Sequence, residues 1–144
     1  MGLTMPALVR ALLLILGIAC ALPAGAESAP IVVLRSDTTA AFFRANGGDY
    51  ERLLQPWRDL FARHNVSARE QRAAELTGSR GVLILASSVA LSEAERQAIR
   101  GRMAEGWSVL GTWAVGVRDG KGQWAGYGFI DELFAAQVAS ELAP

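Results

Sequence analysis

Two short runs of apolar residues constrain most strongly what this chain can fold into. Ile31–Leu34 and Val82–Ala86 contain no polar residue. Continuous apolar runs of this length, rich in β-branched residues, are typical of strands that are buried on both faces. Segments with helical spacing separate these runs and follow them. Buried strands that alternate with helices of ten or more residues predict βαβ units and a mainly parallel sheet.

Two further segments bring the predicted sheet to about four strands. Trp107–Trp113 is expected to form one of them, and a short, weakly apolar strand is expected around Asn65–Arg69. No internal repeat or linker divides the chain. We therefore predict a single α/β domain with a small, mainly parallel sheet flanked by helices.

Capping residues and helical spacing indicate where the first helices begin. The polar cluster Ser36–Thr39 is suited to cap a short helix, and Asp49 to cap a second helix over Tyr50–His64. The apolar residues of that second helix share one face. Pro56 lies inside it, which predicts either that the helix begins near Gln55 or that it is kinked.

A capping box and a C-cap glycine bound the next helix. Ser92 and Glu95 have the spacing of a capping box, and Gly106 follows the expected last turn. The inner face of this helix is predicted to carry Ala94, Ala98 and Ile99. A last helix is predicted over Phe129–Leu142, with its apolar residues on one stripe.

The N-terminal segment is typical of a secretory signal peptide. Arg10 is its one charged side chain, the apolar run Ala11–Leu22 follows, and Ala24 and Ala26 supply the small residues of a cleavage site. We predict cleavage before Glu27, so that residues 1–26 are the signal peptide and residues 27–144 form the mature domain.

Cleavage would remove the only cysteine, Cys20. The mature domain would then have no thiol, which excludes thiol catalysis, thiolate metal ligands and disulfides. Two alternatives remain open, a lipoprotein acylated on Cys20 and an uncleaved anchor, although the apolar run is shorter than the ~20 residues that a membrane span requires. We expect an exported protein, periplasmic or extracellular, with no membrane span in its mature part.

The charge balance and the missing motifs exclude several classes of partner. The 14 basic and 14 acidic residues cancel, whereas nucleic-acid binding requires a basic patch. The sequence contains neither G-x-G-x-x-G after a strand nor G-x-x-x-x-G-K-[ST]. One histidine and one cysteine make a poor zinc set. We therefore expect no nucleic acid, no cofactor and no metal.

Candidate ligand-binding residues follow from the predicted sheet. In an open parallel sheet, ligands bind beyond the carboxyl ends of the strands. This rule selects the following residues: Ser36, Asp37, Thr38, Ser87, Ser88, Thr112, Trp113, Arg118 and Asp119. The alternative is structural, with the Ser and Thr residues capping helices and with Arg118 and Asp119 in an exposed turn.

Trp124 joins this set because it and Trp113 flank the glycine-rich loop Gly116–Gly128. Exposed aromatic faces in an exported protein suit the C–H faces of sugar rings. The alternative is that both side chains hold the loop on the sheet edge.

No catalytic motif is present. Ser87, His64 and Asp37 could be drawn as a triad, but no G-x-S-x-G elbow supports it. We predict no catalytic residue. The alternative is a hydrolase or a carbohydrate-processing accessory that uses Asp37 or Ser88.

Gly106–Gly116, with the sequence GWSVLGTWAVG, resembles the strand and elbow of class I glutamine-amidotransferase-like domains. Val82–Ser88, Val117–Asp119 and Trp124 extend the resemblance, which covers about Ile31–Phe134 and is to exported members of this flavodoxin-like superfamily. The resemblance implies a three-layer flavodoxin-like sandwich. Such domains occur in larger envelope proteins that handle polysaccharide and in the trimerisation domain of some β-galactosidases.

The chain departs from the catalytic pattern of these domains. Trp113 stands where active amidotransferases have the nucleophilic cysteine after Leu-Gly-x, and the next glycine, Gly116, falls one residue late. The downstream His and Glu have no counterpart. The resemblance therefore implies a non-catalytic domain that binds or scaffolds in the cell envelope, with a glycan or an envelope protein as partner. A truncated remnant of a larger envelope protein is a further alternative, because the chain stops at Pro144 without a final strand. Neither the ligand nor the oligomeric state follows from the sequence.

Overall fold

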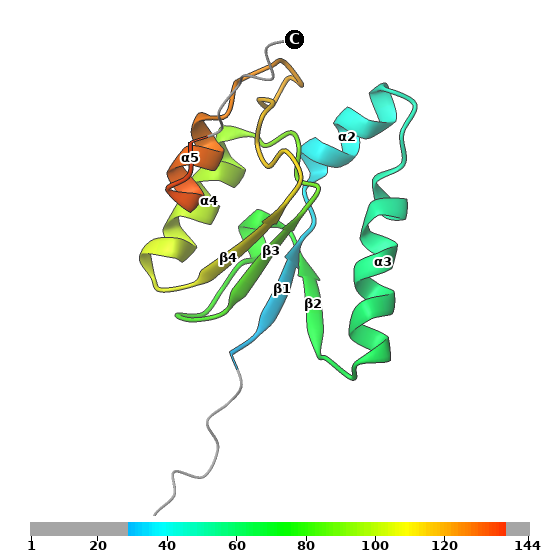
Figure 1. The fold of residues 1–144 in the computed structure, drawn as a ribbon, viewed down its shortest axis with the longest axis vertical. Coiled ribbons are helices and arrows are strands. Elements are labelled where there is room, and N and C mark those ends of the chain that lie inside the picture. The colour runs from blue at the N-terminus through cyan, green and yellow to red at the C-terminus, as the bar shows by residue number, and fades with distance from the viewer. Residues whose placement is uncertain (1–28, 138–144) are drawn as a thin grey trace, which may run out of the picture.

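A four-stranded, all-parallel sheet lies at the centre of the computed structural model, which describes residues 29–137 (Figure 1). The strands are β1 (Ile31–Leu34), β2 (Ala68–Gln71), β3 (Val82–Ala86) and β4 (Ser108–Thr112). Their order in the sheet is β2-β1-β3-β4, which is the flavodoxin-like order as far as it goes. The predicted parallel sheet is thus confirmed. The predicted signal peptide lies outside the described residues.

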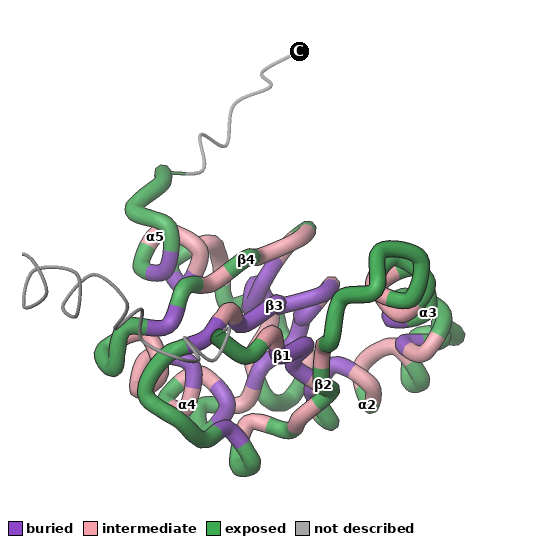
Figure 2. The backbone as a smooth tube through the Cα atoms, turned by 90° about the horizontal axis from the view of Figure 1, so that it is seen from below, coloured by how far each residue is buried: buried purple, intermediate pink, exposed green. Residues whose placement is uncertain are grey.

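Helices cover both faces of the sheet (Figures 1 and 2). They are α2 (Asp37–Ala45), α3 (Tyr50–Arg63), α4 (Glu93–Ala104) and α5 (Gly128–Phe134), with a 3₁₀ turn at Ala73–Glu75. On one face, Val33 and Ile84 pack against Leu54 of α3. On the other face, a larger cluster joins Leu34 and Leu85 of the sheet to the residues that α4 and α5 bury. The predicted three-layer α/β sandwich is therefore confirmed. None of the helices within residues 29–137 is long and apolar enough to cross a membrane.

The capping residues act as predicted. Ser36 Oγ accepts a hydrogen bond from the Thr39 N–H at 3.0 Å, and Asp49 Oδ1 accepts one from the Glu51 N–H at 3.0 Å. Ser92 opens α4 through a complete capping box. Each cap satisfies an N–H that the first turn of a helix would otherwise leave unpaired.

Three sequence-based expectations need correction. α3 runs without a break through Pro56, so it does not begin near Gln55. α5 ends at Phe134, because Ala135 adopts a left-handed conformation with φ of 48°. The expected helix therefore does not continue over residues 135–137, and residues 138–142 lie outside the described part of the chain. On α4, Ala94 is exposed and Glu95 is buried instead.

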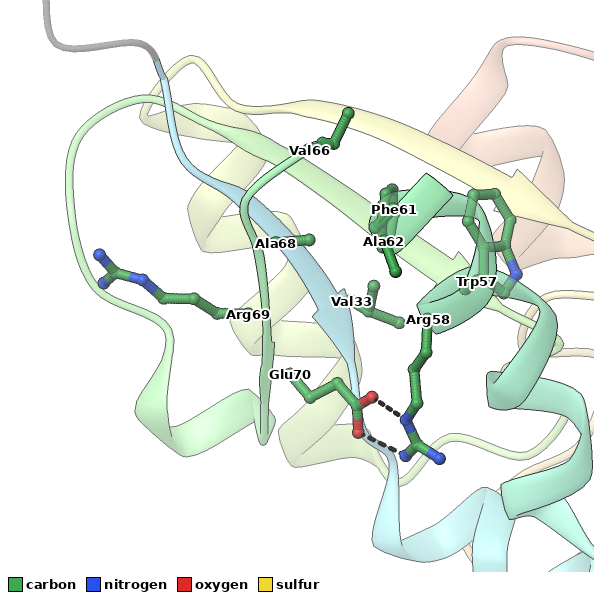
Figure 3. A pocket seen from close by; sticks show the side chains of 9 residues that line it. All are labelled: Val33, Trp57, Arg58, Phe61, Ala62, Val66, Ala68, Arg69 and Glu70. Carbon is green, nitrogen blue, oxygen red and sulfur yellow. Dashed lines mark hydrogen bonds and ion pairs between the residues drawn. The ribbon is translucent and has the colours of Figure 1, made fainter. Parts of the chain in front are cut away.

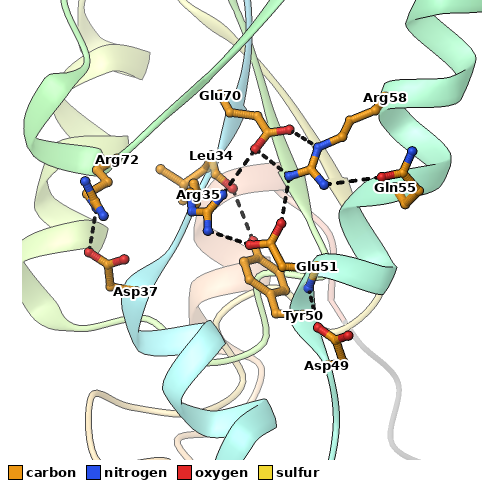
Figure 4. A network of polar contacts seen from close by, with 10 residues as sticks. All are labelled: Leu34, Arg35, Asp37, Asp49, Tyr50, Glu51, Gln55, Arg58, Glu70 and Arg72. Carbon is orange, nitrogen blue, oxygen red and sulfur yellow. Dashed lines mark hydrogen bonds and ion pairs between the residues drawn. The ribbon is translucent and has the colours of Figure 1, made fainter.

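A network of ion pairs joins α3 to the carboxyl ends of β1 and β2 (Figure 4). Arg58 of α3 donates from Nε and Nη2 to the two carboxylate oxygens of Glu70, at 2.5 and 2.8 Å. Arg58 also contacts Glu51 at 2.8 Å, and Arg35 contacts Glu51 at 2.5 Å. Hydrogen bonds from Arg58 lower the pKa of Glu70. Strand β2 has the sequence AREQ and offers α3 little apolar surface, so the ion pairs hold α3 against it.

The Arg58→Ala variant is expected to lose about 0.5–1 kcal/mol of the free energy of unfolding at pH 7, because the pair is partly exposed. The pKa of Glu70 in the folded protein lies below its ordinary value of 4.5. The pair therefore stabilises the fold above that pH, and its contribution is lost as the pH falls through the folded pKa. Urea unfolding between pH 7 and pH 3 tests this. Arg63→Ala, on the same helix but without a carboxylate partner at Arg63 within residues 29–137, is the control. An Arg58→Ala variant as acid-sensitive as the wild type would contradict the prediction.

Candidate functional site

The carboxyl ends of β1 and β3 form the switch point of the sheet, where ligands bind in related architectures. β1 and β3 are neighbours, but the chain leaves them toward opposite edges of the sheet. In this structure, buried polar side chains fill that position: Ser36, Thr39, Ser88 and Glu95. These side chains are buried, so a ligand cannot enter the switch point itself in this conformation.

Hydrogen bonds connect most of these buried groups. Ser36 Oγ donates to Glu95 Oε1 at 2.7 Å. The other carboxylate oxygen of Glu95 accepts from the N–H and the hydroxyl of Ser92, at 2.7 and 2.8 Å. Thr39 Oγ1 donates to the Ala90 carbonyl at 2.6 Å. Ser36 thus caps α2 and ties that helix to α4, which is a structural role.

Ser88 and Tyr50 lie in the same buried region. The Tyr50 hydroxyl contacts the carbonyls of Leu34 and Ala86, at 3.2 and 3.4 Å, and its burial raises the pKa of this phenol. Ser88 is fully buried, and among the described residues its Oγ is the one buried side-chain polar atom without a hydrogen-bond partner. A substrate cannot reach this hydroxyl in the observed conformation.

The other residues of the conceivable triad lie apart. Asp37 is exposed at the start of α2, where its Oδ2 pairs with Arg72 Nε at 2.9 Å (Figure 4). His64 is the C-cap of α3 just before β2 begins, so it lies toward the amino ends of the parallel strands, whereas Asp37 follows the carboxyl end of β1. Ser87, His64 and Asp37 are therefore not brought together.

Backbone strain marks the carboxyl ends of β3 and β4. Ser87, Trp113 and Ala114 all have positive φ, at 50°, 38° and 53°, a region that residues other than glycine adopt rarely. The Ser87 N–H donates to Thr112 Oγ1 at 3.1 Å, which joins the two strand ends. The turn after Thr112 leaves the Trp113 side chain 71% exposed. Strain of this kind is concentrated at functional sites in proteins.

The segment Arg118–Trp124, called here the hairpin loop, lies beyond β4. Arg118 pairs with Trp124 in an antiparallel bridge and with Ala90 in a parallel one. Asp119 Oδ1 accepts hydrogen bonds from the N–H groups of Lys121 and Gln123, both at 2.9 Å, and these bonds lower the pKa of Asp119. Asp119 thus serves the turn. The Trp124 side chain remains 57% exposed.

A cavity of about 340 Å³ separates α2 from the hairpin loop. Its side chains include Thr38, Phe42, Asn46, Arg118 and Lys121. The sequence-based rule selected Thr38 and Arg118 but missed the other three. A signal for two of them was present, because Thr38, Phe42 and Asn46 recur every four residues and so share one side of α2.

A second cavity, of about 270 Å³, lies between α3 and strands β1 and β2 (Figure 3). Trp57, Phe61 and Val66 give it apolar walls, and the Arg58–Glu70 pair lies at one end. No sequence-based candidate lines this cavity. No three His, Cys, Asp or Glu side chains come together as a metal site within residues 29–137.

Comparison with known proteins gives a similarity to a solved structure. No known protein family matches the sequence, and no curated protein matches it either. Among solved structures, the chain is similar to a β-galactosidase from Bifidobacterium adolescentis, with a TM-score of 0.62 and 18% sequence identity. The similarity covers 75% of this chain and 54% of the β-galactosidase chain, so this chain spans about half the length of that one. At this identity, the similarity shows a shared fold alone.

Proposed function

We propose that this chain is an exported, non-catalytic domain that binds polysaccharide in the cell envelope. The observation that carries the proposal is the exposure of two tryptophans beyond the carboxyl end of β4. Trp113 and Trp124 are 71% and 57% exposed. Exposed tryptophans are uncommon on a surface without a binding role, because their large apolar area is costly in water.

The chemistry of the other candidates supports binding over catalysis. Ser88 is buried, Asp37 is paired with Arg72, and His64 lies at the end of α3 that precedes the amino end of β2. Trp113 stands at the strained turn where, in the amidotransferase-like domains that the sequence resembles, the nucleophile is expected. A strained turn that presents an indole in place of a nucleophile suits recognition of a ligand.

Two further observations support export and a carbohydrate ligand. Residues 1–26 have the pattern of a signal peptide, which would deliver the domain to the envelope. The similar solved structure is, by its name, a β-galactosidase, which is a carbohydrate-active enzyme. The same fold therefore occurs in a protein that acts on carbohydrate, which supports a carbohydrate ligand for this chain.

Binding of oligosaccharides to the purified protein tests the proposal. The probes are cello-oligosaccharide, chito-oligosaccharide and oligogalacturonate, with tryptophan fluorescence as the readout. We expect at least one probe to bind, and Trp113→Ala or Trp124→Ala to weaken it about tenfold, as for an aromatic anchor in an interface. Leu60→Ala on α3 is the control, because Leu60 is 38% exposed and lies outside this surface. Unchanged affinity in both tryptophan variants, or no binding of any probe, would contradict the proposal.

A further inference from the structure

The cavity between α2 and the hairpin loop has a distinct electrostatic character. Two cationic residues, Arg118 and Lys121, line it, and no acidic residue does. Among the described residues, Lys121 makes no ion pair, and Arg118 makes none either. The acid of the hairpin loop, Asp119, does not line the cavity. Its Oδ1 accepts the two backbone hydrogen bonds of the turn, which lower its pKa with a smaller contribution from the charge of Lys121. Arg118, Lys121 and Asp119 together keep a net positive charge. The cavity therefore favours an anionic group.

The guanidinium group of Arg118 is positioned to receive such a group. It lies over the Phe42 ring, 5.0 Å from the ring centroid, and its Nη1 donates to the Gly122 carbonyl at 2.9 Å. An arginine side chain carries five N–H donors in a planar fork that fits a carboxylate. One contact to a carbonyl leaves most of these donors available.

The rest of the lining supplies neutral polar groups. Asn46 donates from Nδ2 to the Phe42 carbonyl at 2.8 Å, which leaves its Oδ1 as an acceptor. Thr38, which carries a hydroxyl group, also lines the cavity. Acceptors and hydroxyl groups beside a cationic centre match the hydroxyl groups of a sugar that bears a carboxylate. The cavity, at about 340 Å³, lies at the lower end of the usual range of ligand pockets, which is roughly 300–1,000 Å³.

The cavity is also held in shape before any ligand arrives. Arg96 of α4 donates from Nη2 to the carbonyls of Gly116 and Arg118, at 2.8 and 3.1 Å. The Arg118–Trp124 bridge and the Asp119 turn hold the hairpin loop internally. A site that is already ordered loses little conformational entropy on binding.

We propose that this cavity binds a carboxylate-bearing sugar residue of an acidic polysaccharide. Arg118 and Lys121 hold the carboxylate, and Thr38 and Asn46 contact the sugar hydroxyls. This inference rests on the proposed function and names its substrate class. Trp124 is paired with Arg118 in an antiparallel bridge, and residues paired in this way project to the same side. The exposed indole therefore lies where the next sugar of the chain can reach it.

Titration calorimetry with oligogalacturonate and with its methyl ester tests this inference, because esterification removes the charge and keeps the sugar. We expect the acid to bind at least tenfold more tightly than the ester. Lys121→Gln, at an exposed position whose change leaves the fold intact, is expected to weaken binding of the acid about threefold to tenfold. Arg118→Gln is expected to weaken it more than tenfold. Arg63→Gln, on α3, makes the same change of charge outside the cavity and is expected to bind as the wild type does.

The outcomes separate this inference from the proposed function. Equal affinity for acid and ester, or an unchanged affinity in Lys121→Gln, would overturn the inference. If tryptophan-dependent binding persisted in that case, the proposed function would stand. Binding of the acid that depends on Lys121 but not on Trp113 or Trp124 would support the cavity as the binding site and overturn the proposed role of the two exposed tryptophans. Inorganic phosphate that bound as tightly as the oligosaccharide would show a simple anion site and overturn the assignment to a sugar. No binding of any probe would overturn both proposals.

Discussion

The Gly116→Ala variant is expected to lose about 3 kcal/mol of the free energy of unfolding, because it combines backbone strain with a steric clash. Gly116 has φ of 61°, and a Cβ added there would lie 2.6 Å from Phe129 Cδ1. Phe129 is buried in the larger core cluster and cannot swing aside. The backbone cannot shift easily either, because the Gly116 N–H donates to the Ser88 carbonyl at 2.8 Å. Urea unfolding monitored by circular dichroism measures the loss.

Gly126→Ala is the matched control for this prediction. Gly126 has φ of 82°, but a Cβ added there meets nothing within 4 Å. This variant is expected to lose only the cost of the left-handed backbone, about 1 kcal/mol. The difference between the two variants isolates the clash with Phe129. Equal losses would show that Phe129 can repack and would contradict the prediction.

The Glu95→Ala variant is expected to lose about 3 kcal/mol of the free energy of unfolding, since a buried carboxylate with several hydrogen bonds is removed. Ser36 Oγ would keep only the longer contact to the Ala90 carbonyl, at 3.4 Å, and the Ser92 N–H would lose the partner that completes the capping box. Ser36 is fully buried, so water cannot replace the carboxylate freely beside its hydroxyl. The same change would release α4 from the N-terminus of α2.

Glu93→Ala is the control for Glu95→Ala. Glu93 lies two residues earlier in the first turn of α4, and its side chain is 69% exposed. Its contact with Arg100 is at the surface, so this variant is expected to unfold close to the wild type. A loss in Glu95→Ala no larger than that in Glu93→Ala would show that the buried carboxylate does not stabilise the fold.

The strands that are buried on both faces could be predicted from the sequence to the residue. Ile31–Leu34 and Val82–Ala86 are the bounds of both the apolar runs and the strands. Strand β2 could not be predicted as well, because its sequence AREQ has no apolar pattern. It is a strand because its backbone pairs with β1 from Ile31 opposite Ala68 onward. The strand expected around Asn65–Arg69 was therefore placed about two to three residues too early.

The location of the candidate site could be predicted from the sequence, but which of its side chains are buried and which are exposed could not. The rule for parallel sheets gives the carboxyl ends of the strands, yet it cannot show which hydroxyls are enclosed when two strand ends converge. Ser88 is enclosed there, whereas Trp113 is exposed. Glu95 carried a weak signal, because it lies four residues before the buried Ile99 and shares its side of the helix. Lys121 carried none, since its place beside α2 depends on how the hairpin loop folds back.

Arg96 of α4 connects three parts of the molecule, namely α4, α5 and the segment that follows β4. Its guanidinium lies 4.9 Å from the centroid of the Phe129 ring while it binds the carbonyls of Gly116 and Arg118. The Arg96 side chain thus connects α4, a helix on one face of the sheet, to the segment that contains Arg118. A rotation of α4 would therefore displace the segment Gly116–Arg118 as well, because Arg96 binds its carbonyl groups. Arg96, which does not line the cavity, therefore helps to hold Arg118 in its place beside α2, together with the backbone hydrogen bonds of Arg118 to Val89 and Leu91.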